Sequence, residues 1–300
     1  MPLSKPAIQR LMFAFVCFVW GTNWVAMKVG ITAVPPGYFS GTRWAFAGLV
    51  LLAWRYFNNM SIRVPRHLLP RLIWLSLLMI TFNAFIMLYG LRHVSSGLAS
   101  VLSSAVTPIA LLGFAVMFGQ ERFNARQVVA IGVGIAGLLL LFGPKAASGR
   151  LDWMELLGAA GILIGNLSYC LGSVLCKPLM GTIPPALLVA VTNLFGGIAL
   201  LVLSIAFEPG VDAVLTGNWG LNAWIAWMVM VFAGSLGATI IYFFLVRDWG
   251  ASRAGTYAFI SPIIGVFAGI VMLGEQVAPL DAAGMTLMLL AAALVLRRSA

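Results

Sequence analysis

Charged residues are scarce in this 300-residue chain: Asp, Glu, Lys and Arg together make up 9% of it, whereas 62% of the residues are hydrophobic. A soluble protein carries about 25% charged residues, so a water-exposed globular fold is excluded. Apolar runs of about 20 residues, long enough to cross a bilayer as helices, recur along the whole chain. We therefore expect an all-α integral membrane protein without a separate soluble domain.

Cysteine and histidine are also rare, with three and two residues respectively. Cys17, Cys170 and Cys176 fall in apolar runs and form no CxxC pair, which is typical of buried small hydrophobic side chains. The enzyme motifs HExxH and GxxxxGK[ST] are absent from the sequence. We expect no catalytic residue, no metal site and no cofactor, and a membrane-embedded enzyme is the weaker alternative.

Acidic residues number only eight, and each lies in a loop or at the end of an apolar run. A carboxylate that relays protons is expected in the middle of a membrane span, so the sequence does not favour tight proton coupling through a buried acid. Facilitated diffusion, or coupling through Glu121 or Glu275 at the rim of a span, stays open. Rings of charge that select ions are absent as well, which makes a channel another weaker alternative.

Turn signals divide the apolar sequence into ten expected spans. Lys5 and Arg10 precede the first span as in a signal peptide, but the run continues to about Val34 without a small-residue cleavage site, so we expect a retained helix. The expected spans are 11–33, 37–57, 71–92, 95–118, 124–143, 153–176, 185–207, 221–246, 250–273 and 280–297.

The two halves of the chain follow the same plan. Lys28 and Lys177 each stand seven residues before a double proline. Because each half holds five expected spans, an odd number, the second half crosses the membrane in the opposite direction. We expect two inverted five-helix repeats, residues 1–147 and 148–300. The lysine pair is predicted to gate the path or to attract a carboxylate, and the alternative is that both side chains snorkel to the membrane interface.

Two stretches rich in small residues, one in each half, contain an interior proline. Pro108 stands 13 residues before Glu121, and Pro262 stands 13 residues before Glu275. A proline inside a helix removes a backbone hydrogen bond and bends the helix. Interrupted helices at corresponding positions of two halves are a sequence indicator of a transport site at the repeat interface. We therefore predict helix breaks at both prolines.

The basic residues gather on one side of this predicted topology, which carries 13 of the 18 Lys and Arg residues. The positive-inside rule places that side, with both termini, in the cytoplasm. The net charge of +10 is thus explained by the orientation of the chain in the membrane. We expect no nucleic-acid partner, because the sequence has no basic face interleaved with aromatic residues. The expected location is a bacterial inner membrane, where the lipid bilayer and a small-molecule substrate are the partners of a monomer or weak homodimer.

Several short motifs, in order, resemble one family. Trp20-Gly21-Thr22-Asn23, followed by Lys28, is similar to the opening motif of EamA-type members of the drug/metabolite transporter superfamily. Leu88-Tyr89-Gly90-Leu91 and Leu273-Gly274-Glu275 resemble its later motifs, whereas Gly119-Gln120-Glu121 departs by the inserted glutamine. The resemblance covers essentially the whole chain, and the aromatic content looks closest to the YddG group of aromatic amino-acid exporters. It implies a ten-helix exporter whose central cavity is lined by spans one, three, four, six, eight and nine.

Aromatic and polar side chains at membrane depth are the candidates for substrate contact. Trp20 and Trp24 are four residues apart, so they share one helix face, and they lie near the middle of a span rather than at the membrane interface. Aromatic rings would stack on an aromatic substrate, at about 0.5–1.5 kcal/mol per ring pair, or on a cation. Serines near the two prolines would bind a substrate ammonium, or the small residues only allow close helix packing. The predicted substrate-binding residues are Trp20, Asn23, Trp24, Tyr89, Ser100, Ser103, Ser104, Asn166, Tyr169, Tyr242, Tyr257 and Ser261.

These features predict a secondary exporter of small metabolites that works by alternating access of the two repeats. Aromatic or other apolar amino acids are the expected substrates. Lipophilic cations or drugs and nucleotide sugars are alternatives within the transporter class. A phosphorylated substrate would need several bases in the middle of the spans, and only Lys28, Arg43 and Lys177 come near that position.

Overall fold

The computed structural model describes residues 5–119, 125–148, 152–249 and 257–296, and all regular structure in these ranges is helical. The α-helices are α1 (Lys5–Ala33), α2 (Pro36–Phe57), α3 (Leu69–Ser76), α4 (Asn83–Leu91), α5 (Ser96–Met117), α6 (Ala125–Ala147), α7 (Trp153–Cys176), α8 (Pro185–Phe207), α9 (Val211–Val214), α10 (Leu221–Met228), α11 (Thr239–Trp249), α13 (Tyr257–Leu273) and α14 (Pro279–Leu296). Short 3-10 helices form η1 (Arg66–Leu68) and η3 (Lys177–Gly181), and wider π-helical turns form η2 (Leu77–Phe82) and η4 (Val229–Ala238). The prediction of an all-α protein is confirmed.

Every expected span overlaps a helix or a run of consecutive helices. α3, η2 and α4 form one run over the expected span 71–92, and α10, η4 and α11 form one run over the expected span 221–246. Among the described residues, six helical stretches are long and apolar enough to cross a membrane. Three shorter apolar helices are Ile131–Phe142, Ile260–Leu273 and Pro279–Ala291. These stretches are those of an integral membrane protein.

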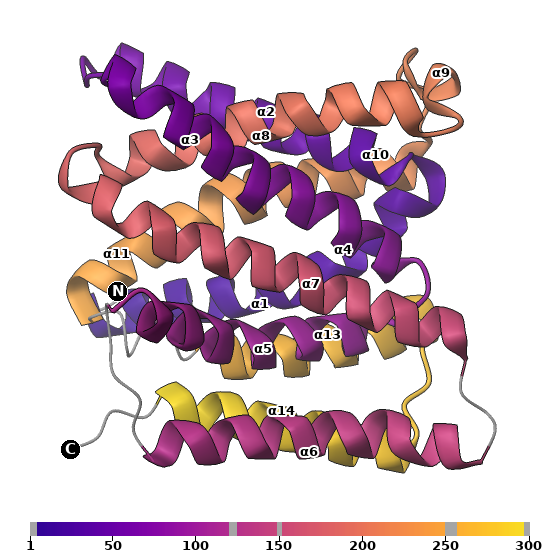
Figure 1. Ribbon diagram of the computed structural model, residues 1–300. Coiled ribbons are helices and arrows are strands. Elements are labelled where there is room, and N and C mark those ends of the chain that lie inside the picture. Colours follow the sequence, from indigo (N-terminus) through magenta and orange to yellow (C-terminus); the bar gives the residue numbers. More distant parts are fainter. Residues whose placement is uncertain (1–4, 120–124, 149–151, 250–256, 297–300) are drawn as a thin grey trace.

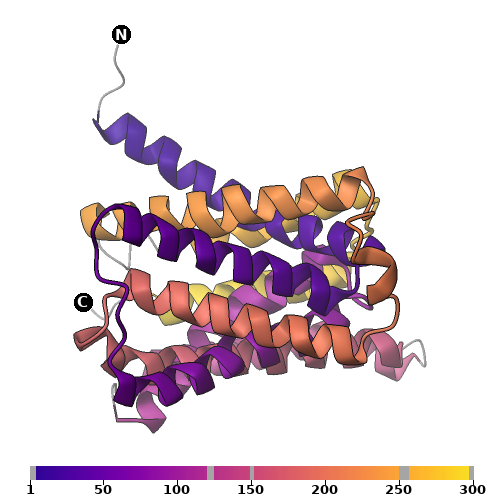
Figure 2. The same ribbon diagram turned by 90° about the horizontal axis from the view of Figure 1, so that it is seen from above.

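The long helices lie side by side along a common direction (Figures 1 and 2). α6 packs on α14 at one side of the bundle, and α2 packs on α8 at the opposite side. Between these pairs, α5 contacts both α7 and α13, and α1 contacts α13. The start of α1 and the end of α14 lie toward the same end of the bundle (Figure 1). The bundle thus has two ends, and the functional residues are distributed along its length.

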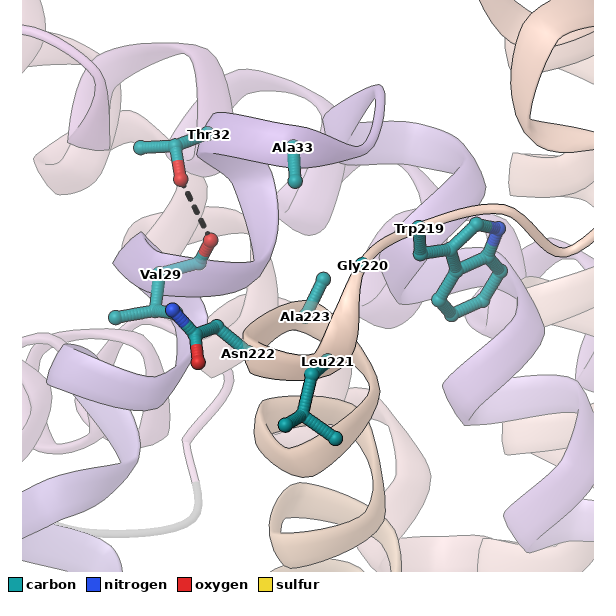
Figure 3. Close-up of a pocket in the computed structure, with 8 residues that line it drawn as sticks. All are labelled: Val29, Thr32, Ala33, Trp219, Gly220, Leu221, Asn222 and Ala223. Atoms are coloured by element: carbon teal, nitrogen blue, oxygen red, sulfur yellow. Dashed lines mark hydrogen bonds between the residues drawn. The ribbon is translucent and has the colours of Figure 1, made fainter.

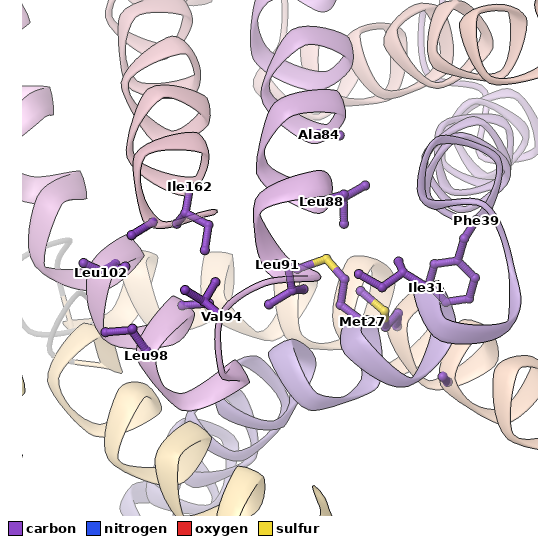
Figure 4. Close-up of a cluster of buried hydrophobic side chains, with 14 of the residues drawn as sticks. Met27, Ile31, Phe39, Ala84, Leu88, Leu91, Val94, Leu98, Leu102 and Ile162 are labelled. Carbon is purple, nitrogen blue, oxygen red and sulfur yellow. The ribbon is translucent and has the colours of Figure 1, made fainter. Parts of the chain in front are cut away.

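The largest hydrophobic cluster joins helices from both halves of the chain. Met27 and Ile31 of α1 pack beside Phe39 of α2, and Leu88 of α4 and Ile162 of α7 belong to the same cluster (Figure 4). Lipid tails are as apolar as these side chains, so close packing rather than water exclusion holds membrane helices together. The cluster therefore fixes how α1, α2, α4 and α7 sit around one another.

Glycines set the closest approaches between helices. A Cβ on Gly158 of α7 would lie 2.6 Å from the carbonyl oxygen of Gly90 in α4, closer than real Cβ atoms come. Gly137 of α6 and Gly284 of α14 face each other, because a Cβ on either would lie 3.0 Å from the carbonyl oxygen of the other. Small residues thus let neighbouring backbones meet, as is common in membrane helix pairs.

The irregular helical turns do not lie at the positions that the sequence predicts. We predicted helix breaks at Pro108 and Pro262, but α5 and α13 continue through both residues. A proline removes only one backbone hydrogen bond, and the neighbouring turns keep theirs. Instead, π-helical turns occur in η2 and η4, inside two helical runs that the expected repeat makes equivalent. Such turns are frequent at functional sites.

Candidate functional site

A stripe of hydroxyl side chains runs along α5. Ser96, Ser100, Ser103 and Thr107 follow one another at intervals of four, three and four residues, so they share one helix face. Ser103 Oγ donates a hydrogen bond of 3.1 Å to Oδ1 of Asn166 on α7. This contact joins two predicted substrate-binding residues that come from different halves of the chain.

Two buried polar atoms beside this stripe have no hydrogen-bond partner within the described ranges: Ser100 Oγ and Asn166 Nδ2. Ser100 is 1% exposed and Asn166 is 6% exposed. Leaving a buried polar atom without a partner costs about 1–3 kcal/mol, so each such atom needs an explanation. A polar group of a ligand would satisfy an atom of this kind. The region between α5 and α7 is therefore the candidate substrate site.

α13 borders the serine stripe on another side. Gly265 lies against Ser100, since a Cβ at Gly265 would come within 2.8 Å of the serine Oγ. One turn earlier, Ser261 Oγ donates a hydrogen bond of 3.2 Å to the carbonyl oxygen of Cys17 on α1. Ser104, next to the stripe on α5, is partly buried. Small residues in this region thus serve close helix packing, one of the two interpretations that the sequence left open.

Three of the predicted aromatic residues form a cluster that we call the aromatic triad: Trp20, Tyr242 and Tyr257. The ring centroid of Trp20 on α1 lies 4.4 Å from that of Tyr257 on α13 and 5.2 Å from that of Tyr242 on α11. The two tyrosine centroids are 5.4 Å apart. Tyr257, Ser261 and Gly265 follow at intervals of four along α13, so the triad adjoins the serine stripe.

The remaining predicted residues of the central region lie outside the triad's ring contacts. Trp24 packs against the largest hydrophobic cluster. Asn23 faces η4, because its Oδ1 lies 3.4 Å from the position that a Cβ of Gly234 would take. Tyr169 of α7 is 41% exposed and makes no ring contact with the triad, but it interacts electrostatically with Tyr242 and Tyr257. The structure therefore gathers some of the predicted set and distributes the rest along neighbouring helices.

Glu275 follows α13 and binds the start of α5. Its carboxylate accepts hydrogen bonds from the backbone N–H groups of Ser96, at 2.6 Å, and Gly97, at 3.2 Å, and from the Ser96 hydroxyl at 2.9 Å. Lys28 Nζ forms an ion pair with the carboxylate at 3.3 Å and donates to the carbonyl oxygen of Val94 at 2.5 Å. An anion at a helix N-terminus satisfies the free N–H groups and the helix dipole. Glu275 therefore clamps α1, α5 and α13 together.

The pKa of Glu275 reflects this environment. Partial burial disfavours the charged form and by itself raises the pKa. The hydrogen bonds from Ser96 and Gly97 and the charge of Lys28 lower the pKa more strongly. The net result is a pKa below the ordinary glutamate value, so the carboxylate is ionised at neutral pH.

Glu208 follows α8 and has the same role at the start of α2. It is 6% exposed and accepts hydrogen bonds from the N–H groups of Gly37, at 3.0 Å, and Tyr38, at 3.2 Å. The hydroxyls of Ser204 and Tyr89 also donate to this carboxylate, the second at 2.8 Å. Tyr89, a predicted substrate-binding residue, is thus engaged in a contact between α4 and α8 rather than in the triad.

Glu208 binds the start of α2 and Glu275 binds the start of α5, so both lie at the end of the bundle where α1 meets α2 and α4 meets α5 (Figure 1). We call this end the carboxylate end. A hollow of about 320 Å³ there lies between the last turns of α1 and the start of α10, lined by Val29, Thr32 and Trp219 (Figure 3). A second hollow, of about 400 Å³, lies between α2, α8 and α10. Neither hollow is lined by a predicted substrate-binding residue. The central cavity that the resemblance implies is thus not one of these two, and the triad and the Ser103–Asn166 contact bring side chains together in the middle of the bundle.

The predicted gating and coupling residues differ from one another in their surroundings. Lys28 is held at the carboxylate end, whereas Lys177 is exposed and begins η3. Glu121 lies outside the described residues. The sequence analysis did not identify Glu208 as a candidate residue. Its position after an apolar helix, like that of Glu275, could have indicated its role.

Apolar helices packed around polar hydroxyls and an aromatic triad make up a helical membrane protein. The sequence model of the EamA-like transporter family matches residues 8–143 and 156–297, and the chain belongs to this family. The resemblance to the drug/metabolite transporter superfamily is thereby confirmed, and the protein is a membrane transporter.

Named relatives agree with this assignment. The uncharacterized transporter YoaV of Bacillus subtilis (strain 168) is 30% identical over 265 residues, which cover 87% of each chain. The uncharacterized inner membrane transporter YedA of Escherichia coli (strain K12) is 29% identical and covers 88% of this chain and 82% of its own. One solved crystal structure matches the fold with a TM-score of 0.65 over 95% of both chains at 20% identity.

Proposed function

We propose that the protein is a secondary exporter of small metabolites, with aromatic or other apolar amino acids as its substrates. The observation that carries this proposal is the pairing of the aromatic triad with the buried, unpartnered atoms Ser100 Oγ and Asn166 Nδ2. Rings contact an apolar or aromatic side chain, and the serine hydroxyl and the asparagine N–H group meet polar groups of the substrate. The export needs no catalytic residue, metal or cofactor.

Transport occurs by alternating access of two inverted five-helix repeats, residues 1–147 and 148–300. If the helices of the two halves are matched in order, α2 corresponds to α8, α5 to α13 and α6 to α14, and each of these pairs packs together. In the same order, α1 corresponds to α7 and α4 corresponds to α11. The contact between α1 and α13 then matches the contact between α7 and α5, and the contact between α4 and α7 matches the contact between α11 and α1. Packing that is exchanged in this way supports a twofold relation between the halves.

The two glutamate clamps form the gate at the carboxylate end. Glu208 and Glu275 belong to the second repeat, and the N–H groups that they bind, those of Gly37 and Ser96, belong to the first. Opening this end requires both clamps to break. In the proposed topology both termini lie in the cytoplasm of a bacterial inner membrane, so the carboxylate end faces outward and the described conformation is closed to the outside.

Lipophilic cations are the second substrate class, since the faces of Trp20, Tyr242 and Tyr257 also attract cations. Uptake measurements distinguish the two classes. Purified protein in proteoliposomes preloaded with unlabelled phenylalanine is tested for counterflow of labelled phenylalanine, with tetraphenylphosphonium, a nucleotide sugar and non-aromatic amino acids as competitors. The proposal predicts uptake that exceeds that of empty liposomes and is inhibited best by aromatic amino acids. Inhibition by the cation alone would transfer the assignment to cation export, and uptake no faster than in empty liposomes over the whole panel would refute the proposal.

The same vesicles address the driving force. The described acids lie outside the middle of the helices, so uptake that ignores an imposed pH gradient is the expected result, as for facilitated diffusion. Uptake that follows the gradient would assign the coupling to the clamp at Glu275 or to Glu121. The variants Glu275→Gln and Glu121→Gln would then separate these two residues.

A further inference from the structure

α2 carries a buried charge whose partner is missing from the described part of the chain. Arg43 is 5% exposed, and Ser40, one turn before it on the same face, is 0% exposed. Arg43 Nε and Ser40 Oγ both lack a hydrogen-bond partner. The guanidinium carbon lies 4.1 Å from the ring centroid of Trp44, which supports the cation from one side only. This face of the helix thus holds two buried donor atoms, Arg43 Nε and Ser40 Oγ, without an acceptor in the described part of the chain.

The neighbouring contacts of α2 determine where this face points. Gly41 lies against Leu201 of α8, and Gly48 lies against Leu194 of the same helix. Thr42 accepts a hydrogen bond of 3.0 Å from Trp227 Nε1 of α10. Ser40 and Arg43 lie on neither of these sides. Since α2 also contacts α1 and α4, the face of Ser40 and Arg43 is the one directed into the bundle.

The two carboxylates at the carboxylate end already have partners. Glu208 accepts hydrogen bonds from Gly37, Tyr38 and Tyr89, and Glu275 is paired with Lys28. Arg55 lies on the same helix and is 6% exposed. Unlike Arg43, it is hydrogen-bonded, because its Nε and Nη2 donate to the Ser61 carbonyl oxygen at 3.2 and 2.6 Å. A buried charge without a partner is strongly unfavourable, and inside membranes such residues usually mark a substrate or ion path.

We propose that Arg43, with Ser40, binds the carboxylate of the transported molecule; this inference rests on the proposed export function. A guanidinium is a planar fork that matches a carboxylate with two parallel hydrogen bonds, and the Ser40 hydroxyl supplies a third donor. One cation balances one carboxylate, so the negative charge of the substrate is neutralised while it is bound. A phosphate group would need further cations, and Lys28 is engaged at the carboxylate end. The site therefore selects monocarboxylates and discriminates against the corresponding amides.

Counterflow in proteoliposomes tests this inference with three variants. Arg43→Gln should lower phenylalanine counterflow by about tenfold or more, because a charge-assisted hydrogen bond is lost, and Arg43→Lys should restore part of the rate. Arg55→Gln is the matched control, with the same residue type, helix and burial, and it should transport at the wild-type rate. Phenylalaninamide should compete with labelled phenylalanine far less than unlabelled phenylalanine does. Wild-type rates in Arg43→Gln, or equal competition by the amide, would overturn the inference.

Thermal unfolding in detergent separates this inference from the proposed function. The midpoint of unfolding should rise more with phenylalanine than with phenylalaninamide in the wild type, and this difference should vanish in Arg43→Gln. Without ligand, Arg55→Gln should lower the unfolding temperature more than Arg43→Gln does, because Arg55 loses two hydrogen bonds whereas Arg43 loses only its contact with the Trp44 ring. Failure of counterflow in the wild type over the whole substrate panel would refute the export proposal. Equal stabilisation by the acid and amide members of every pair in a panel of carboxylates would refute the assignment of Arg43.

Discussion

At the residue scale, the recurring arrangement is a glutamate of one half that binds the first N–H groups of a helix in the other half. Glu208 binds the start of α2, and Glu275 binds the start of α5. Each carboxylate meets the positive end of a helix dipole, which offsets the cost of holding a charge next to the membrane. A glutamine has nearly the same shape but carries no charge and turns an N–H group toward one of the donors.

Replacing Glu208 by glutamine should destabilise the folded protein. Charge-assisted hydrogen bonds contribute about 1.5–3 kcal/mol each, and the variant weakens several at once, so we expect a clear fall in the unfolding midpoint in detergent. Asp212→Asn is the control, because Asp212 is an exposed acid on α9, close in sequence to Glu208. Equal midpoints for Glu208→Gln and Asp212→Asn would contradict the clamp.

The clamp at Glu275 should respond to acid. Its pKa is lowered in the folded protein, so its contribution to stability is complete above the ordinary glutamate pKa of 4.5 and is lost as the pH falls through the lowered value. The gap in unfolding midpoint between wild type and Glu275→Gln should therefore be widest near neutral pH and narrow below pH 4.5. A gap that stays constant across this range would show that the charge of Glu275 does not hold the clamp.

At the element scale, glycines decide how closely helices pack. A Cβ at Gly137 of α6 would meet Met288 Cγ at 2.7 Å and the Gly284 carbonyl oxygen at 3.0 Å, whereas a Cβ at Gly132 on the same helix meets nothing within 4 Å. Gly137→Ala should thus push α6 from α14 and lower the free energy of unfolding by about 1–3 kcal/mol. Gly132→Ala, the matched control, should raise it by up to about 1 kcal/mol through helix propensity. Denaturation in mixed micelles measures both, and equal effects would contradict this packing.

The positions of the helices could be predicted because a bilayer requires about 20 apolar residues whose backbone groups are satisfied within the helix. The positions of irregular turns inside a helix could not be predicted. Pro108 and Pro262 suggested breaks, but α5 and α13 continue through them, and the π turns of η2 and η4 contain neither residue. The position of a π-helical turn depends on contacts with neighbouring helices, and these contacts cannot be deduced from a single sequence.

At the scale of the whole molecule, a candidate site arises only where helices from both halves meet. Residue types indicated Trp20, Tyr242 and Tyr257 separately, but their contact depends on how α1, α11 and α13 pack. Tyr89 is a tyrosine like Tyr242 and Tyr257, but its hydroxyl binds Glu208 in a clamp instead. The sequence therefore predicts which residues suit a site, and the packing of the two halves decides which of them meet there.

The central claim is that the carboxylate end opens and closes during transport. A Cβ on Gly97 of α5 would lie 3.4 Å from the Cβ of Val266 on α13, so cysteines at these two positions are within reach of a disulfide between the halves. Gly97→Cys and Val266→Cys as single variants control for the substitutions themselves.

The most direct measurement is counterflow of labelled phenylalanine into proteoliposomes by the double-cysteine protein, before and after reduction, with the extent of cross-linking determined in the same sample. Counterflow should stop when the disulfide forms and return on reduction, while both single variants should transport in either condition. Undiminished counterflow in fully cross-linked protein would contradict the proposed gate, because the carboxylate end would then not need to open.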